Sequence, residues 1–239
     1  MKAVILAAGR GSRMKQLTDK QPKCLVKLRG KPLIEWQLAA IRGAGITEIA
    51  IVTGYKKGLI AKYKLYEFHN MRWFETNMVT SLACAKKWLQ TEPCLISYSD
   101  IFYETSAVHS LINSSAKLAI TYDPNWLTIW KKRFEDPLLD AESFLIDSAN
   151  QIIEIGNKPD SVDQVQGQYM GLLKITPESW KQITSILAKL SKNARDQISM
   201  TRLLQNLIQY RKFQITGVPY EGEWGEIDSY SDLAKFNNN

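Results

Sequence analysis

Cysteine and histidine are scarce in this sequence, and their spacing excludes the sites that they usually build. The chain of 239 residues has three cysteines and two histidines. Cys24, Cys84 and Cys94 are odd in number and form no Cys-x-x-Cys pair, and His69 and His109 stand far apart. A disulfide framework needs paired cysteines, and a structural zinc site needs clustered ligands. Neither feature is expected here.

Long apolar runs are lacking as well. No stretch approaches the roughly 18 consecutive apolar residues that indicate a membrane helix. The N-terminal run "AVILAAG" is too short for a secretory signal, and arginines follow it directly. We therefore expect a cytoplasmic protein without membrane insertion. No linker-like segment divides residues 1–239, which predicts a single domain.

The charges of the sequence are unbalanced, with a formal net charge of +7. Such an excess suits nucleic acid, a membrane surface or a small anionic substrate. There is no long basic run and no aromatic motif of the RNA-binding type, and the lysines lie in scattered pairs: Lys56–Lys57, Lys86–Lys87 and Lys131–Lys132. This pattern favours a small polyanion over nucleic acid, and solvated surface lysines account for most of the pairs.

The order of apolar segments predicts an α/β fold. Short continuous apolar runs, typical of strands buried on both faces, occur at residues 2–6, 48–53, 93–99, 117–122 and 169–175. Helical patterns alternate with them at residues 33–43, 79–89, 107–113, 177–190 and 200–210. We expect a Rossmann-like, mixed but mostly parallel central sheet flanked by helices. The turn "DSANQ" (147–151) predicts a hairpin, and hence an antiparallel extension that binds the acceptor substrate.

The loop after the first apolar run, "AAGRGSRM", predicts a phosphate site. A dinucleotide fingerprint needs a small residue where this chain has Met14, and a P-loop needs a Gly-Lys-Ser/Thr ending that is absent. Gly9 and Gly11 let the backbone approach a ligand, while Arg10 and Arg13 supply cationic forks for phosphate oxygens. Such a loop suits a triphosphate.

The segments "LAAGRGSRM" and "QPKCLV" together resemble the opening motif of the nucleotidyltransferases that make nucleotide-activated sugars and alcohols. In that family an apolar strand leads to L-A-A-G-x-G-[ST]-R-[ML] and then to Pro-Lys, here Pro22–Lys23. Nearly the whole chain resembles the CTP-dependent branch, through residues 76–86, 96–103, 133–142, 167–175 and 226–233. The resemblance implies an Mg²⁺-dependent cytidylyltransferase that transfers CMP from CTP to a small phosphorylated acceptor and releases pyrophosphate.

The acceptor that the resemblance implies is phosphoglutamine-like, phosphocholine or 2-aminoethylphosphonate, for decoration of a capsule or cell surface. Activation of a sugar 1-phosphate is the alternative within the family. The sequence leaves open whether two copies of the chain form a homodimer. Residues 1–122 are expected to form the nucleotide-binding half. Residues 123–239 are expected to bind the acceptor and to complete the metal site.

The family pattern also implies the roles of the nucleotide-binding residues. Lys23 and Mg²⁺ would neutralise the α-phosphate of CTP, and Arg13 would bind the departing β- and γ-phosphates. The other implied contacts come from the first loop and from "NMVTSL": Leu6, Ala7, Ala8, Gly9, Gly11, Ser12, Asn77, Thr80 and Ser81. The second segment lies near a helix start, where capping is the ordinary role of such polar residues. Its departure from the sugar-type loop favours a cytidine nucleotide.

Two aspartates far apart in the sequence, Asp100 and Asp228, carry over as the metal ligands, with Glu226 as a third. Magnesium takes few protein carboxylates and completes its shell with phosphate and water oxygens. From the residues alone, Asp228 could instead cap a helix within "YSDLAKF", and Ser229 could be the cap.

The acceptor end is expected at residues 122–142, where aromatic and charged residues gather. Trp126, Trp130 and Glu142 suit an ammonium group, and Arg133 suits a carboxylate, so a zwitterion would use both. The two tryptophans, spaced by four, could equally form a core stripe. Lys158 resembles the lysine before proline that meets the acceptor phosphate in sugar-activating relatives.

Overall fold

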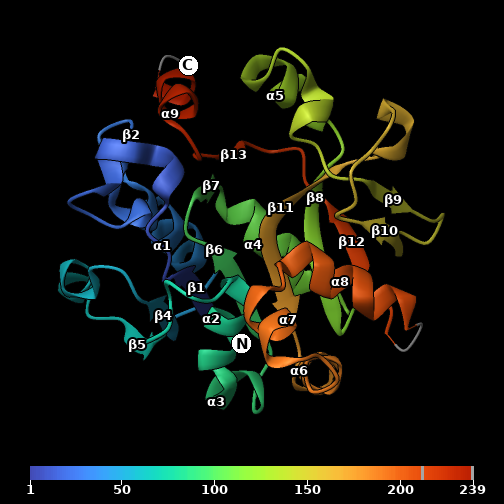
Figure 1. Ribbon diagram of the computed structural model, residues 1–239, viewed down its shortest axis with the longest axis horizontal. Coiled ribbons are helices and arrows are strands. Elements are labelled where there is room, and N and C mark those ends of the chain that lie inside the picture. The colour runs from blue at the N-terminus through green and yellow to red at the C-terminus, as the bar shows by residue number, and fades with distance from the viewer. Residues whose placement is uncertain (211–212, 238–239) are drawn as a thin grey trace.

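The chain builds a seven-stranded mixed sheet in the order β12-β8-β11-β6-β1-β4-β5 (Figure 1). The structure is a computed structural model that describes residues 1–210 and 213–237. The strands of this sheet are β1 (Lys2–Ala7), β4 (Ile49–Thr53), β5 (Tyr66–His69), β6 (Cys94–Tyr98), β8 (Leu118–Asp123), β11 (Gln168–Ile175) and β12 (Thr216–Pro219). All run the same way except β11, which pairs antiparallel with both β6 and β8. The predicted mixed, mostly parallel sheet is therefore confirmed.

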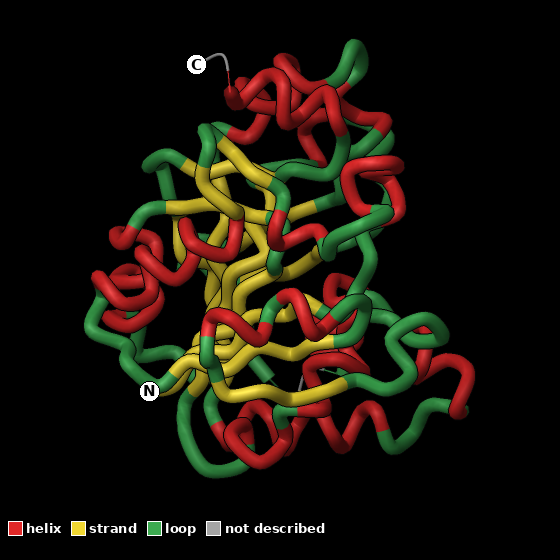
Figure 2. Tube along the Cα trace, turned by 90° about the vertical axis from the view of Figure 1, so that its left-hand side faces the viewer, coloured by secondary structure: helices red, strands yellow, loops and turns green. Residues whose placement is uncertain are grey.

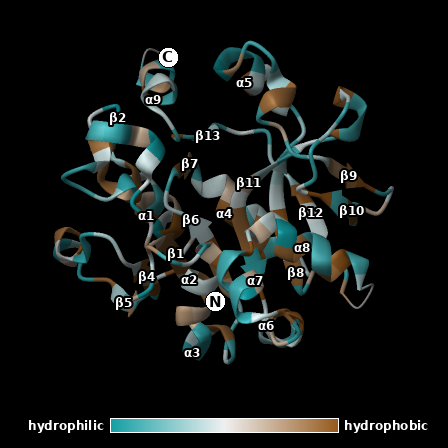
Figure 3. Cartoon of the chain, viewed as in Figure 1, coloured by the Kyte–Doolittle hydropathy of each residue, from teal (hydrophilic) through white to brown (hydrophobic). Residues whose placement is uncertain are grey.

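Helices cover both faces of the sheet, because the central strands are apolar on both sides (Figures 2 and 3). Alternate residues of β1 enter two separate cores, with Ile5 on one face and Leu6 on the other. The first face is covered by α1 (Leu33–Gly43), α4 (Thr105–Asn113) and α5 (Trp126–Arg133). The second is covered by α2 (Met78–Cys84), α3 (Lys86–Leu89), α6 (Pro177–Leu187) and α8 (Met200–Gln209). The short α7 (Lys192–Gln197) connects α6 to α8.

The predicted hairpin is present as β9 (Phe144–Ile146) and β10 (Ile152–Ile155), which pair antiparallel. Asn150 adopts the left-handed conformation at φ 58° in its turn, which asparagine tolerates. The Asp147 carboxylate accepts hydrogen bonds from the backbone N–H groups of Ala149 and Gln151. The local sequence "DSANQ" thus supplies both the conformation and the hydrogen bonds of the turn.

A third core cluster joins the two ends of the chain and positions the site. It contains Met14 from the first loop, Phe102 from β7 (Ile101–Tyr103) and Leu233 from α9 (Tyr230–Asn237). Two further short strands, β2 (Lys27–Leu28) and β3 (Lys31–Pro32), pair beside it. In Figure 1, α9 lies next to β2 and far from β12. The short strand β13 (Trp224–Glu226) lies between β12 and α9 in the sequence. Among the described residues, no helix has the length and apolar character needed to cross a membrane.

Candidate active site

The first loop wraps around the side chain of Lys23. Gly11 adopts φ 75°, and a Cβ atom there would lie 2.8 Å from the Cβ and Cδ atoms of Lys23. Only glycine meets both requirements, the left-handed backbone and the close approach. Met14, which replaces the small residue of a dinucleotide fingerprint, is buried in the third core cluster. The loop is therefore shaped around a lysine, and its methionine anchors it to the core.

Lys23 lies in a buried position between two aspartates. Its Nζ atom donates to Asp100 Oδ2 at 2.8 Å and also to Asp228 Oδ1. Arg13 approaches the same centre from the solvent side, with Nη1 2.8 Å from Asp228 Oδ2. Burial alone would lower the pKa of Lys23, but the carboxylates around it outweigh burial and raise this pKa. The ammonium therefore stays charged.

Three carboxylates converge at this point, from Asp100, Glu226 and Asp228, with one oxygen atom of each within 4.8 Å of the others. Backbone pairing brings them together: β7 lies antiparallel to β13 (Trp224–Glu226), and the N–H of Ile227 donates to the carbonyl of Asp100 at 2.9 Å. Burial and the neighbouring aspartates raise the pKa of Glu226. The Oδ1 atom of Asp100 is buried without a hydrogen-bond partner. Hard oxygen donors of this kind, one of them unsatisfied, fit a divalent cation such as Mg²⁺.

Ser229, rather than Asp228, caps α9. The Ser229 hydroxyl accepts the N–H of Asp232 at 3.1 Å, and the Asp232 carboxylate accepts the N–H of Ser229 at 2.9 Å. This reciprocal arrangement is a capping box with aspartate in the third helical position. The Asp228 carboxylate is thus left to the two cations.

A cavity of about 290 Å³ opens above this centre. It is lined by all the nucleotide-binding residues that the sequence predicted except Ala7 and Thr80. Ala7 is buried in the opposite core, and Thr80 donates to the carbonyl of Arg195 at 3.5 Å, so the prediction is corrected at these two positions. The pattern missed four lining residues, namely Trp73, Thr76, Met78 and Ser99. The segment 73–78, which supplies three of them, carries no motif or spacing that marks a ligand contact.

The polar atoms of the second segment are only partly available to a ligand. Asn77 caps α2, with its side-chain oxygen accepting the N–H of Met78 at 2.7 Å and its amide donating to the carbonyl of Gln197 at 3.1 Å. Ser81 accepts a hydrogen bond from Asn70 at 3.0 Å, which leaves its hydroxyl proton to be donated. Ser81 is therefore the better placed of these two for reading a base.

The predicted acceptor contacts of the two tryptophans are wrong. Trp126 and Trp130 are each 3% exposed and pack in the core beneath α5. The indole N–H of Trp126 donates to the carbonyl of Val165 at 2.9 Å. Their spacing by four reflects a core stripe, as the alternative interpretation held.

Arg133 and Lys158 are also engaged elsewhere. The Arg133 side chain, 3% exposed, donates from Nε to Asp232 Oδ1 at 3.0 Å and lies 3.5 Å from Glu226 Oε2. Lys158 donates to the carbonyl of Leu139 at 2.8 Å, and also to that of Leu138, in an exposed position. Arg133 is thus held by Asp232, while its buried Nη1 atom has no hydrogen-bond partner among the described residues. The acceptor roles of Arg133 and Lys158 stay predictions.

Glu142 is a predicted acceptor residue whose carboxylate has little to offset its charge. It accepts a hydrogen bond from Thr201 at 3.3 Å, while burial raises its pKa. Burial also raises the pKa of Tyr98, and the charges of Asp100 and Glu142 both add to this effect. The charges of Asp100 and Glu142 therefore both act on Tyr98. Within the part of the chain that the structure describes, no cation pairs with Glu142.

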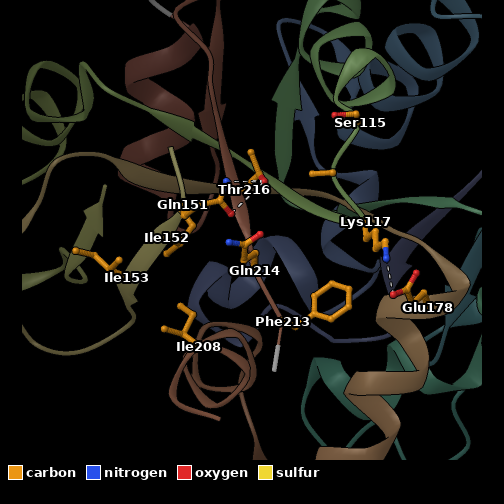
Figure 4. Close-up of a pocket in the computed structure, with 11 residues that line it drawn as sticks. Ser115, Lys117, Gln151, Ile152, Ile153, Glu178, Ile208, Phe213, Gln214 and Thr216 are labelled. Carbon is orange, nitrogen blue, oxygen red and sulfur yellow. Dashed lines mark hydrogen bonds and ion pairs between the residues drawn. The ribbon is translucent and has the colours of Figure 1, made fainter. Parts of the chain in front are cut away.

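A larger cavity, of about 720 Å³, lies away from these groups, between β10, β12 and the ends of α6 and α8 (Figure 4). Lys117 and Glu178 are the charged residues of its lining, and they pair with each other at 2.6 Å. The rest of the wall is polar or apolar, as with Gln214 and Phe213. Size alone therefore does not mark the site, because the ionisable groups converge in the smaller cavity.

Comparison with known proteins agrees with this geometry. The family model of the MobA-like NTP transferase domain matches residues 3–154. A CTP:phosphoglutamine cytidylyltransferase from Campylobacter jejuni is 37% identical, over 98% of each chain. The fold is shared with the inositol-1-phosphate CTP transferase from T. maritima (TM-score 0.77, 18% identity, 98% of this chain and 95% of the other). It is also shared with the CTP:phosphocholine cytidylyltransferase from Streptococcus pneumoniae (TM-score 0.71, 20% identity, 99% and 97%). The chain therefore belongs to the nucleotidyltransferases that carry the MobA-like NTP transferase domain.

Proposed function

We propose that this nucleotidyltransferase transfers CMP from CTP to a small phosphorylated acceptor and releases pyrophosphate. The observation that carries the proposal is the meeting of Lys23 and Arg13 with three carboxylates beside the cavity of the first loop. Such a set of charges suits a triphosphate with its counter-cation. The near full-length similarity to a CTP:phosphoglutamine cytidylyltransferase supports cytidine as the base and an amine-bearing acceptor.

The reaction requires no nucleophile from the protein. An oxygen of the acceptor's phosphoryl group forms a bond to the α-phosphorus of CTP, and the bond from that phosphorus to the bridging oxygen breaks, so that pyrophosphate leaves. Lys23, fixed within the loop, supplies positive charge at the α-phosphate. Arg13, whose side chain is 69% exposed, can turn to the departing phosphates. Both cations exchange carboxylate partners for phosphate oxygens as CTP binds.

The residues that would hold Mg²⁺ are Asp100, Asp228 and Glu226. When bound, the ion supplies charge that stabilises the developing negative charge on the phosphates. Lys23 lies 2.8 Å from Asp100 and Arg133 lies 3.5 Å from Glu226, so two cations offset the charge of this acidic group before CTP and the metal bind. Asp100 comes from the expected nucleotide-binding half, and the other two ligands come from the half that begins at residue 123. The proposed metal site would therefore join the two halves.

For the acceptor, we propose that Glu142 binds an ammonium group. A half-buried carboxylate with raised pKa and a single hydrogen bond is poorly satisfied without a cation. Phosphoglutamine, phosphocholine and 2-aminoethylphosphonate all supply one. A sugar 1-phosphate without an amino group does not, which weakens the alternative of neutral-sugar activation.

The test is pyrophosphate release measured with CTP, UTP, dTTP, ATP and GTP, each with these three acceptors and with a sugar 1-phosphate. Turnover with CTP and an amine-bearing acceptor is the expected result. Preference for UTP or dTTP with the sugar phosphate would replace the proposal by the alternative. Turnover with none of the pairs would contradict both.

A further inference from the structure

The segment 70–77, between β5 and α2, forms one wall of the nucleotide cavity. Trp73, Thr76 and Asn77 line it together with the first loop. Gly54 lies between the two walls and lets them come close, because a Cβ atom there would lie 2.5 Å from both the carbonyl oxygen of Ala8 and the Cβ atom of Trp73. Arg13 and Lys23, the cations proposed to bind the phosphates, line the cavity from a different segment, in and shortly after the first loop. The segment 70–77 is therefore placed to contact the nucleoside rather than the phosphates.

Asp196 of α7, which is 7% exposed, makes charged contacts with this wall, and its neighbour Gln197 adds hydrogen bonds to Glu75 and Asn77. Arg72 donates to both carboxylate oxygens of Asp196, at 3.2 and 2.6 Å, and Lys192 donates to one of them at 2.8 Å. The carbonyl of Asp196 also accepts the N–H of Asn77 at 2.7 Å. Asp196 thus holds the segment near both of its ends.

We propose that Asp196 is a positioning residue for the nucleoside end of the CTP site, acting through Arg72 and Asn77 on the wall that carries Trp73. The inference rests on the proposed function and adds a residue from the acceptor half to CTP binding. Asp196 does not line the cavity, so its effect is on the position of residues that do. Hydrogen bonds from Arg72 and Lys192 lower the pKa of Asp196 to about 2, so a change to asparagine removes a full charge.

The test compares Asp196→Asn and Arg72→Gln with the control Lys192→Gln, which removes an outer partner whose side chain is 71% exposed. The KM for CTP and kcat are measured separately, and dissociation constants are measured for CTP and for inorganic tripolyphosphate in Mg²⁺. We expect the first two variants to raise the KM and the dissociation constant of CTP by about tenfold, because the wall then occupies its binding position for only part of the time. Tripolyphosphate binding and kcat should stay within about threefold of the parent, because the phosphate end is untouched.

Arg72→Lys provides a second measure if the stronger variants fold poorly. It keeps the charge but cannot make the two-point contact, so its KM should lie between those of the parent and Arg72→Gln. A parental KM for CTP, or an equal loss for CTP and tripolyphosphate, would overturn the positioning role. A parent protein that does not bind CTP would contradict the proposed function itself, which separates the two failures.

Discussion

Replacing Lys23 by methionine tests whether this lysine neutralises the acidic group that is proposed to hold the metal. Its side chain is 8% exposed and bonds to both Asp100 and Asp228. Methionine keeps the stem within the loop but removes the charge. The carboxylates of Asp100, Asp228 and Glu226 would then face one another, with Arg13 as their remaining neighbour on the solvent side.

The expected magnitude follows from burial. Removing one partner of a buried ion pair costs about 3–5 kcal/mol of folding free energy, since the other charge is left without compensation. Protonation of Glu226, whose pKa is already raised, relieves part of the repulsion, so we expect about 3 kcal/mol. Turnover should fall by about 10²-fold or more, because a charge that stabilises the transition state is lost.

The assay is urea unfolding of the parent and Lys23→Met, in EDTA and in saturating Mg²⁺, with pyrophosphate release measured on the same samples. Mg²⁺ must displace the Lys23 ammonium in the parent but not in the variant, so it should stabilise the variant more. Lys20→Met is the control, because Lys20 lies three residues before Lys23 in the sequence and is exposed. Equal unfolding free energies of variant and parent in EDTA, or equal stabilisation of both by Mg²⁺, would refute this account of Lys23.

Three further results are expected. Asp228→Asn should lower turnover by about 10²-fold while the circular dichroism spectrum stays native. Ser229→Ala removes the cap of α9, so it should cost about 1 kcal/mol of stability and leave turnover unchanged. The reverse pattern would contradict both assignments. Glu142→Gln should raise the KM of amine-bearing acceptors by about tenfold or more and leave the KM of CTP unchanged; a parental acceptor KM would remove Glu142 from the site. The pKa of Asp196 is lowered from 3.8 to about 2, so its charge stabilises the fold fully above pH 3.8 and less as the pH falls toward 2. The melting-temperature difference between the parent and Asp196→Asn should therefore be constant above this window and shrink within it, and a difference that grows on acidification would contradict the ion pair.

The fold could be predicted where the sequence signal is local. The strands of the parallel core are continuous apolar runs, and the hairpin turn has the residues that its backbone requires. β5 (Tyr66–His69) was missed, because it is an edge strand with mostly exposed side chains and no apolar run. The helix expected over residues 79–89 is broken at Ala85, whose φ and ψ of −85° and 14° leave the helical region. Alanine is a good helix former, so the break has no signal in the sequence itself.

In the candidate site as well, the sequence predicted what is local and not the contacts between distant segments. The first loop is contiguous, so its glycines and cations could be recognised from their spacing. The approach of Asp100 to Asp228 depends on pairing between β7 and β13, which have three residues each. Strands so short carry no periodic pattern, and the family resemblance alone suggested that these aspartates meet. The contribution of Trp73 was missed for a related reason, since segment 70–77 is placed by α7, more than a hundred residues later.

At the acceptor end, the types of residue indicated the charges that are present, but not which groups within the protein those charges contact. Arg133 was expected to bind a substrate carboxylate, yet the sequence also holds Asp232, which caps α9 and accepts from Arg133 at 3.0 Å. The Nε atom of Arg133 is therefore engaged within the protein, while its buried Nη1 atom has no hydrogen-bond partner among the described residues. Its position 3.5 Å from Glu226 instead ties it to the acidic group. We therefore expect recognition of a zwitterionic acceptor to begin with its ammonium at Glu142, because phosphoglutamine, phosphocholine and 2-aminoethylphosphonate all carry this group.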